Sequence, residues 1–352
     1  MRKRWVRSLA TGAVLALVLS ACGSNDDSTT PAEGEPASET SDAVPGADSE
    51  AVGFIFVGPK DDYGYNQAAY EGALAVEEAF PDLEILTAEN VPEDDNATRV
   101  MEDMVSKGAK IIFATSYGHL DPAVKVATEN PDVVVVQQGN FIQGTVLPNM
   151  GTYFGTVYEP VYLAGIAAGK ATKTNKLGYV YAFPIPQTIA NINAFQLGAA
   201  SVNPDVEVLI SYVSDDITTA FNDPTTGASL AEQMIGQDAD VIFQVAGLSG
   251  QGALEAACDA DVYGIGVDVD QALALPDLTC IVTSAEKKLV EGVSEAIQRV
   301  ADGSSVGGTL ILDAAQDPPK VAVSPFHNHP DLLTDELQTL LDDATAAMAS
   351  GD

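Results

Sequence analysis

The sequence predicts an α/β protein of two lobes, each a doubly wound parallel sheet with helices on both faces. From residue 51 onward, short apolar runs alternate with amphipathic helical patterns, and this alternation is typical of βαβ units. It occurs as two similar series, which we expect to meet between residues 155 and 176. Roughly 300 residues follow the N-terminal segments, which is enough for two domains.

The first series opens with a buried strand. The run AVGFIFV at 51–57 is continuously apolar, and the helical pattern after it places Ala69, Ala73 and Val76 on one face. The remaining elements are a strand LEILTA (83–88), a helix near ATRVMEDMVSKG (97–108), a strand KIIFATS (110–116), a helix opening at Asp121-Pro122 and a strand DVVVVQQ (132–138).

The second series repeats this plan from residue 176 onward. Each of its strands is again a short apolar run followed by a helical pattern, so a second parallel sheet is predicted. Its elements are KLGYVYAF (176–183), a helix near TIANINAFQLGAASV (188–202), EVLISYV (207–213), a helix opening at Asp223-Pro224, DVIFQVAG (240–247), a helix near GALEAACDA (252–260), VYGIGVD (262–268) and CIVTSA (280–285).

The N-terminal residues are typical of an exported lipoprotein. A basic start, MRKRWVR, precedes about a dozen mostly small apolar residues, a run too short for a comfortable membrane span. It ends in LSAC, which resembles a bacterial lipobox, so we expect cleavage before Cys22 and acylation of that residue. The alternative is an ordinary signal peptide with a chance cysteine. Two or more acyl chains make a stable anchor, which predicts lipid attachment at the extracytoplasmic face of the cell membrane.

The charge of the chain argues against one class of binding partner. Without the signal segment, 12 basic residues remain against 51 acidic ones. A charge near −39 argues against nucleic acid, whose phosphates need a basic face. Two cysteines remain in the folded part, Cys258 in a helical stretch and Cys280 at the start of a strand. An even pair in an exported domain permits one disulfide, and the sequence leaves that pairing undecided.

Unusual polar residues gather where the predicted strands end. In open parallel sheets, ligands bind beyond the carboxyl ends of the strands, so these segments are the candidates for a binding site. They are GPKDDYGYN (58–66), TSYGHLD (115–121), FPIPQT (183–188), AGLSGQG (246–252), GVDVDQ (266–271) and TSAEKK (283–288).

The segment DDYGYNQAAYEGA resembles the D-x-S-F-N-x-x-A-x-x-G opening of the basic membrane protein family of bacterial substrate-binding lipoproteins. The resemblance implies the fold of type I periplasmic binding proteins, in which two doubly wound lobes are joined by a hinge and hold a ligand in the cleft. It further implies binding without catalysis or a cofactor, and delivery of a nucleoside, with purine nucleosides favoured, to the permease and ATPase subunits of an ABC importer. It continues in order through YLAGIAAG (162–169), AFQLGAASVNPDVEV (194–208), FNDPTTGASLAEQMIGQDADVIFQVAG (221–247), GIGVDVDQ (264–271) and TSAEKK (283–288).

In a fold of this type the chain crosses between the lobes more than once. We therefore expect the last part of the sequence to contribute to both lobes. The expected divisions are a signal peptide at 1–21, the lipidated cysteine and a disordered acidic tether at 22–50, a first lobe at 51–174 with about 285–308, and a second lobe at 175–284 with about 309–352.

The resemblance assigns roles to five residues. Asp62 matches the family's acid, Tyr65 its base-stacking aromatic residue and Asn66 its amide, and these groups suit a nucleobase face and edge. Asp268 matches the ribose-binding acid and Lys287 the lysine beside it. The alternative makes Asp62 a helix N-cap and Tyr65 a packing residue, and leaves the last two as surface charges.

Five further residues are weaker ligand candidates. Ser116 and Tyr117 end a strand and could line the cleft. Gly247 belongs to a glycine-rich segment without G-K-S/T, which favours close backbone approach over a phosphate cradle. Asn191 stands where many family members carry a second aromatic residue, a loss that would weaken purine selectivity. Phe183 or Tyr117 could supply the missing face.

Other polar residues have structural explanations. Asp121 and Asp223 each precede proline, as an N-cap precedes N1, and Asp270 and Gln271 are expected to be structural although they match the family motif. No metal site is expected at the histidines, since FHNH lacks suitably spaced partners. These histidines are His119, His327 and His329.

Two other functions compete with the receptor. A nucleoside hydrolase-like enzyme could hold calcium at Asp268, Asp270 and Asp277, but no other part of the chain resembles such hydrolases. A lipoprotein that senses a nucleobase or a sugar would have the same sequence features. A nucleoside fits best, because Asp268 with Lys287 favours a diol and Tyr65 a flat group.

Overall fold

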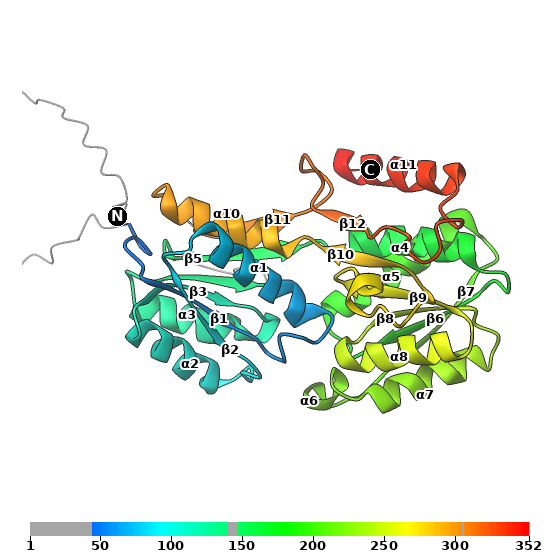
Figure 1. Ribbon diagram of the computed structural model, residues 1–352, viewed down its shortest axis with the longest axis horizontal. Helices are drawn as coiled ribbons and strands as arrows, with labels where there is room; N and C mark the ends of the chain where they lie inside the picture. Colours follow the sequence, from blue (N-terminus) through cyan, green and yellow to red (C-terminus); the bar gives the residue numbers. More distant parts are fainter. Residues whose placement is uncertain (1–43, 140–146, 305, 352) are drawn as a thin grey trace, which may run out of the picture. The chain divides into compact units, whose positions relative to one another are not determined.

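The computed structural model describes residues 44–139, 147–304 and 306–351, with the side chain of residue 154 excepted. These residues form two six-stranded sheets with interleaved helices, as predicted (Figure 1). The predicted signal peptide, Cys22 and most of the predicted tether lie outside the described residues. In the described part of the chain, no helix is both long enough and apolar enough to cross a membrane.

The first sheet is wholly parallel, in the order β11-β5-β4-β3-β1-β2. Helices α1 and α10 pack on one face and α2 and α3 on the other. The elements are β1 (Ala51–Ile55), α1 (Tyr65–Ala79), β2 (Glu84–Ala88), α2 (Asp95–Ser106), β3 (Ala109–Ala114), the short 3₁₀ helix η1 (Tyr117–His119), α3 (Leu120–Glu129), β4 (Val134–Gln138), β5 (Met150–Gly155), α10 (Leu289–Ala301) and β11 (Gly308–Leu312).

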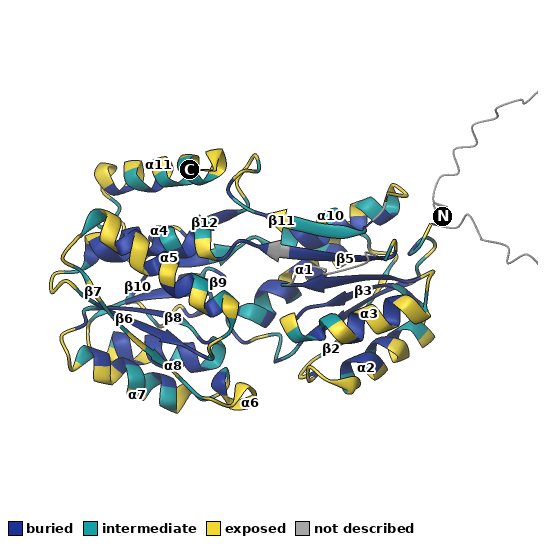
Figure 2. Cartoon of the chain, turned by 180° about the vertical axis from the view of Figure 1, so that it is seen from behind, coloured by how far each residue is buried: buried dark blue, intermediate teal, exposed yellow. Residues whose placement is uncertain are grey.

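Side-chain alternation along the strands explains the two helix layers of this sheet. Phe54 packs with Val293 under α1 and α10, whereas its neighbour Ile55 packs with Met101 and Val126 under α2 and α3. Because successive strand residues point to opposite faces, a continuous apolar run fills both layers. The central strands are buried and the outer helix faces are exposed, whereas the edge strands β2 and β11 are only partly buried (Figure 2).

The second sheet has the order β12-β10-β9-β8-β6-β7, and its edge strand β12 is antiparallel. Helices α4 and α5 cover one face, α7 and α8 the other, and α11 packs on α4. The elements are α4 (Tyr158–Ala171), β6 (Lys176–Tyr181), α5 (Pro186–Val202), β7 (Glu207–Tyr212), α6 (Ile217–Ala220), α7 (Pro224–Ile235), β8 (Val241–Val245), α8 (Gly247–Asp259), β9 (Tyr263–Asp268), α9 (Gln271–Ala274), β10 (Ile281–Lys287), β12 (Val321–Val323) and α11 (Asp335–Ser350).

The helix α4 packs in the second lobe, although the predicted boundary at 174 had placed it in the first. Its small residues allow the approach to α5: a Cβ on Gly165 would lie 2.3 Å from the carbonyl oxygen of Phe195, and one on Gly198 would lie 2.1 Å from that of Tyr162. The chain therefore crosses between lobes before α4, and again after β10 and after β11. Three connections therefore link the two sheets.

The folded part begins earlier than the predicted end of the tether at residue 50. Gly46 is buried, and its amide donates to the carbonyl of Asp132 at 2.9 Å. A Cβ at this residue would meet Val300 at 2.9 Å and Val134 at 3.0 Å, and φ is +78°. A glycine fits here because it has no Cβ and adopts positive φ without strain.

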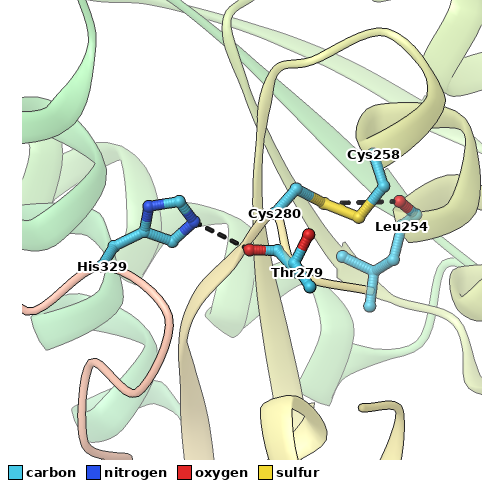
Figure 3. The surroundings of a disulfide bond; sticks show 5 residues. All are labelled: Leu254, Cys258, Thr279, Cys280 and His329. Carbon is cyan, nitrogen blue, oxygen red and sulfur yellow. Dashed lines mark hydrogen bonds between the residues drawn. A yellow bond between two sulfur atoms is a disulfide. The ribbon is translucent and has the colours of Figure 1, made fainter. Parts of the chain in front are cut away.

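A disulfide joins Cys258, near the end of α8, to Cys280, just before β10 (Figure 3). Their Cα atoms are 5.1 Å apart, within the usual range for a disulfide. The sequence had left this pairing open. The bond lies at the amino end of β10, the end away from the predicted ligand site.

Candidate functional site

The loop between β1 and α1 is organised by the carboxylate of Asp62. Its Oδ1 accepts hydrogen bonds from the amides of Gly64 and Gln67, and its Oδ2 accepts from the amide and the side chain of Asn66, all at 2.8–3.1 Å. Asn66 in turn accepts from the amide of Gly58 at 3.2 Å. Burial raises the pKa of Asp62, and these hydrogen bonds oppose the rise. With its four acceptor positions used, this carboxylate caps the first turn of α1.

Tyr65, the first residue of α1, connects the two lobes. The Nζ of Lys287, at the end of β10 in the second lobe, lies 4.6 Å from its ring centroid. Burial and then the charge of Asp268 raise the pKa of Tyr65 above its usual value, so the hydroxyl stays protonated at neutral pH. One face of the ring therefore carries a cation–π contact.

Asp268 and Lys287 form a buried ion pair at the carboxyl ends of β9 and β10. Nζ of Lys287 lies 2.6 Å from Oδ1 of Asp268, and the two side chains are 8% and 7% exposed. Apart from this ion pair, Oδ1 has no hydrogen-bond partner among the described residues. Asp268 has φ +73°, which brings its carboxylate to the start of α1: a Cβ on Gly64 would lie 3.6 Å from its Oδ2.

Asp268 thus faces two sources of positive charge: the ammonium of Lys287 and the N-terminal end of α1. The site therefore combines an aromatic ring, a cation and a carboxylate acceptor contributed by both lobes.

Three of the weaker candidates lie just beyond strand ends, whereas Asn191 lies within α5 and Gly247 begins α8. Among the described residues, no contact joins any of them to Tyr65 or Asp268. The hydroxyl of Ser116 donates to Glu93 at 2.5 Å. Tyr117 is 43% exposed. Phe183 packs with Phe221; Asn191 on α5 is buried, with an Oδ1 that has no hydrogen-bond partner in the described part of the chain; and Gly247 starts α8 with φ +56°.

Sequence reasoning missed three residues around Tyr65. Gln138 accepts a hydrogen bond from the hydroxyl of Tyr153 at 2.7 Å, while Glu93 accepts from the amide of Gly118 at 2.9 Å. Gln138 could have been found, because two polar residues end the otherwise apolar run DVVVVQQ. Glu93 and Tyr153 had no such signal.

Most of the residues that were expected to be structural contact other parts of the protein. Asp223 caps α7, accepting from the amide of Thr226 at 3.0 Å. The cap prediction for Asp121 was wrong: η1 runs directly into α3, so that helix already begins at Leu120 and Asp121 lies in its first turn.

Each of the three histidines contacts another group of the protein. His119 lies 3.0 Å from the carbonyl of Val91, and burial lowers its pKa. His327 pairs with Asp270 at 2.7 Å, and His329 lies 2.9 Å from the carbonyl of Thr279 (Figure 3). Among the described residues, no group of three or more histidine, cysteine or acidic side chains could hold a metal ion, and the acids of the hydrolase alternative form no such group.

Comparisons with known proteins agree with this architecture. Residues 49–341 match the model of a family described as ABC transporter substrate-binding protein PnrA-like. A purine-binding protein of Brucella abortus is 31% identical over 304 residues, covering 86% of this chain and 81% of that protein. An ABC transporter nucleoside-binding protein of Lactococcus lactis is 28% identical over 336 residues, covering 88% of each.

A putative ABC transporter glucose-binding protein of Haloferax volcanii is 36% identical over 230 residues, covering 65% of this chain and 56% of that protein. Among solved structures, a solute-binding protein of an ABC transporter from Aeropyrum pernix superposes with a TM-score of 0.74 at 22% identity, covering 86% of this chain and 91% of that one. The structural likeness supports the fold.

Proposed function

The chain belongs to the PnrA-like family of ABC transporter substrate-binding proteins, which bind substrates and are not enzymes, and from this premise we propose that it captures a purine nucleoside between its two lobes. The observation that carries the proposal is the Asp268–Lys287 pair lying against Tyr65. A ribose diol can donate to the carboxylate of Asp268. The nucleobase stacks on the face of Tyr65 that Lys287 does not cover.

The loop capped by Asp62 positions this ring. Its carboxylate and Asn66 fix the start of α1, so in this proposal they orient Tyr65, and they contact the base only if the ligand displaces one of these bonds. The names of the Brucella and Lactococcus relatives support the same ligand class.

The delivery route follows from the family. We propose that the lobes close on the ligand by hinge motion and that permease and ATPase subunits of an importer receive it. We further propose that Cys22 carries the lipid anchor and holds the protein at the extracytoplasmic face of the membrane. Replacing Cys22 with serine should release the protein from membranes into the soluble extracellular or periplasmic fraction.

A sugar is the second candidate ligand. Asn191 replaces a second stacking ring and has an unpartnered buried Oδ1, which suits a sugar hydroxyl. The Haloferax relative carries a glucose-binding name. Asp268 and Lys287 would serve either ligand, because a nucleoside and a sugar both present neighbouring hydroxyls.

Thermal unfolding of the mature chain with single ligands tests the proposal. The panel comprises purine and pyrimidine nucleosides, free bases, ribose and glucose. A ligand present at a hundred times its dissociation constant should add about 2.7 kcal/mol to the free energy of unfolding. Stabilisation by purine nucleosides is the expected result. Stabilisation by glucose or ribose alone would replace the nucleoside with a sugar.

Removing the ring of Tyr65 should weaken nucleoside binding. Tyr65→Leu loses a stack worth about 1–3 kcal/mol, so the dissociation constant should rise by about 5- to 150-fold. Isothermal titration measures it. The matched control is Tyr65→Phe, which keeps the ring and loses only the hydroxyl, and it should stay much closer to the parent. Equal losses in both variants would mean that the hydroxyl matters and stacking does not.

A further inference from the structure

Gln271, the first residue of α9, is 1% exposed. Its backbone amide and its side-chain oxygen both form hydrogen bonds within the second lobe. Its amide donates to Oγ of Ser284 at 3.0 Å. Its Oε1 accepts from Nε2 of Gln244 at 2.9 Å and from the amide of Val267 at 3.1 Å. A backbone amide can only donate, so the oxygen of Gln271 must face Val267 and the orientation of the side-chain amide is determined. Its nitrogen is therefore presented in one direction.

That nitrogen reaches the first lobe. Nε2 of Gln271 donates to the carbonyl oxygen of Tyr63 at 2.6 Å, across 208 positions of sequence. Tyr63 lies in the loop between β1 and α1, two residues before Tyr65, and has φ +54°. This hydrogen bond joins the ends of the two sheets directly beside the ligand-contacting ring.

Apolar side chains of each lobe pack into the other lobe beside this hydrogen bond. The side chain of Tyr63 packs against Ala272 and Leu275 in a cluster of the second lobe. Val269 and Ala274, from the segment around Gln271, pack in the core cluster of the first lobe under α1 and α10. The hydrogen bond is part-buried beside these apolar side chains, and partial shielding from water makes a hydrogen bond stronger and its loss more costly.

We propose that Gln271 and Tyr63 form a latch that holds the two lobes together over the ligand and sets how long the ligand stays. The proposal rests on capture between the lobes. When the lobes separate, water can satisfy the carbonyl of Tyr63 and the nitrogen of Gln271, so only the closed arrangement depends on their pairing. A weaker latch therefore raises the rate of ligand release and leaves the rate of association nearly unchanged.

Gln271→Glu is the decisive variant. The carboxylate still accepts from Gln244 and Val267, but it cannot donate to the carbonyl of Tyr63 and instead faces it with negative charge. Release of inosine, followed by stopped-flow displacement, should become about 5- to 150-fold faster. The control Gln251→Glu makes the same charge change on α8 in the same lobe, at a side chain that pairs only with Glu255, and should leave release unchanged.

A second variant weakens the latch from the other lobe. Tyr63→Asn removes the aromatic side chain that packs on the second lobe, so it should also speed ligand release. Asparagine tolerates the positive φ at this position. In the double variant the two effects should be less than additive, because both act on one contact. Folding defects are excluded by circular dichroism and by thermal unfolding of each variant.

A distance measurement separates failure of the latch from failure of the nucleoside assignment. Spin labels at Glu129→Cys and Glu232→Cys, on exposed positions of the two lobes, report lobe separation in the mature chain lacking Cys22. Gln271→Glu should shift the distances toward longer values without any ligand. If inosine does not bind the parent protein, the assigned ligand is wrong, and the distances still decide the latch. Unchanged distances in a folded Gln271→Glu protein would overturn the latch, as would unchanged release from a protein that binds inosine.

Discussion

Asp268→Asn should reduce nucleoside binding by at least a hundredfold and should also destabilise the protein. Lys287 would keep its buried ammonium without a counter-charge, and breaking a buried ion pair costs about 3–5 kcal/mol. Asparagine tolerates the φ of +73° at this position, so the variant tests charge and acceptor chemistry without added backbone strain. Urea unfolding measures the loss of stability, and isothermal titration measures the loss of binding.

Two further variants interpret that result. Adding Lys287→Met to Asp268→Asn removes the unpaired ammonium and should recover part of the stability but none of the binding. Asp261→Asn makes the same substitution at an exposed residue with φ +56° and should change neither quantity. If Asp268→Asn bound nucleoside as the parent does, the carboxylate would not be the ribose acceptor.

Loss of the disulfide should destabilise the protein by about 3 kcal/mol, the chain-entropy value for a loop of this length; the cysteines are 22 positions apart. The change to make is Cys258→Ser with Cys280→Ser, measured by urea unfolding. Nucleoside affinity below the unfolding transition should be retained, because Cys280 precedes β10 whereas Lys287 ends it. Stability and binding are thus expected to separate in this variant, unlike in Asp268→Asn.

Reductant supplies the control for the disulfide. It should lower the stability of the parent protein toward that of the double serine variant, and it should leave the variant itself unchanged. A loss below about 0.5 kcal/mol, the range of ordinary surface changes, would mean that the folded contacts between α8 and β10 hold that region without the bond.

The ligand-contacting residues were predictable to different degrees for physical reasons. The strand pattern predicted that the segments of Asp268 and Lys287 lie at the carboxyl ends of strands. The pairing of the two residues was implied by the family resemblance, and in the structure they form an ion pair. Asp62 could equally be read as a cap or as a ligand contact, and only its four hydrogen bonds show that the cap uses its carboxylate. Gln271 was expected to be structural, and its reach to Tyr63 adds a connection between lobes.

The sequence by itself determined most of the strands and helices before residue 286 and the segments at the carboxyl ends of the strands, because burial periodicity and turn residues are encoded over short stretches. It did not predict the antiparallel edge strand β12. The tertiary structure alone decided which lobe α4 joins, that Cys258 meets Cys280, and that Gln271 meets Tyr63. These contacts depend on how the chain crosses between the sheets and on how closely small residues such as Gly165 and Gly198 let helices approach. A periodic pattern specifies a buried face without specifying the partner that buries it.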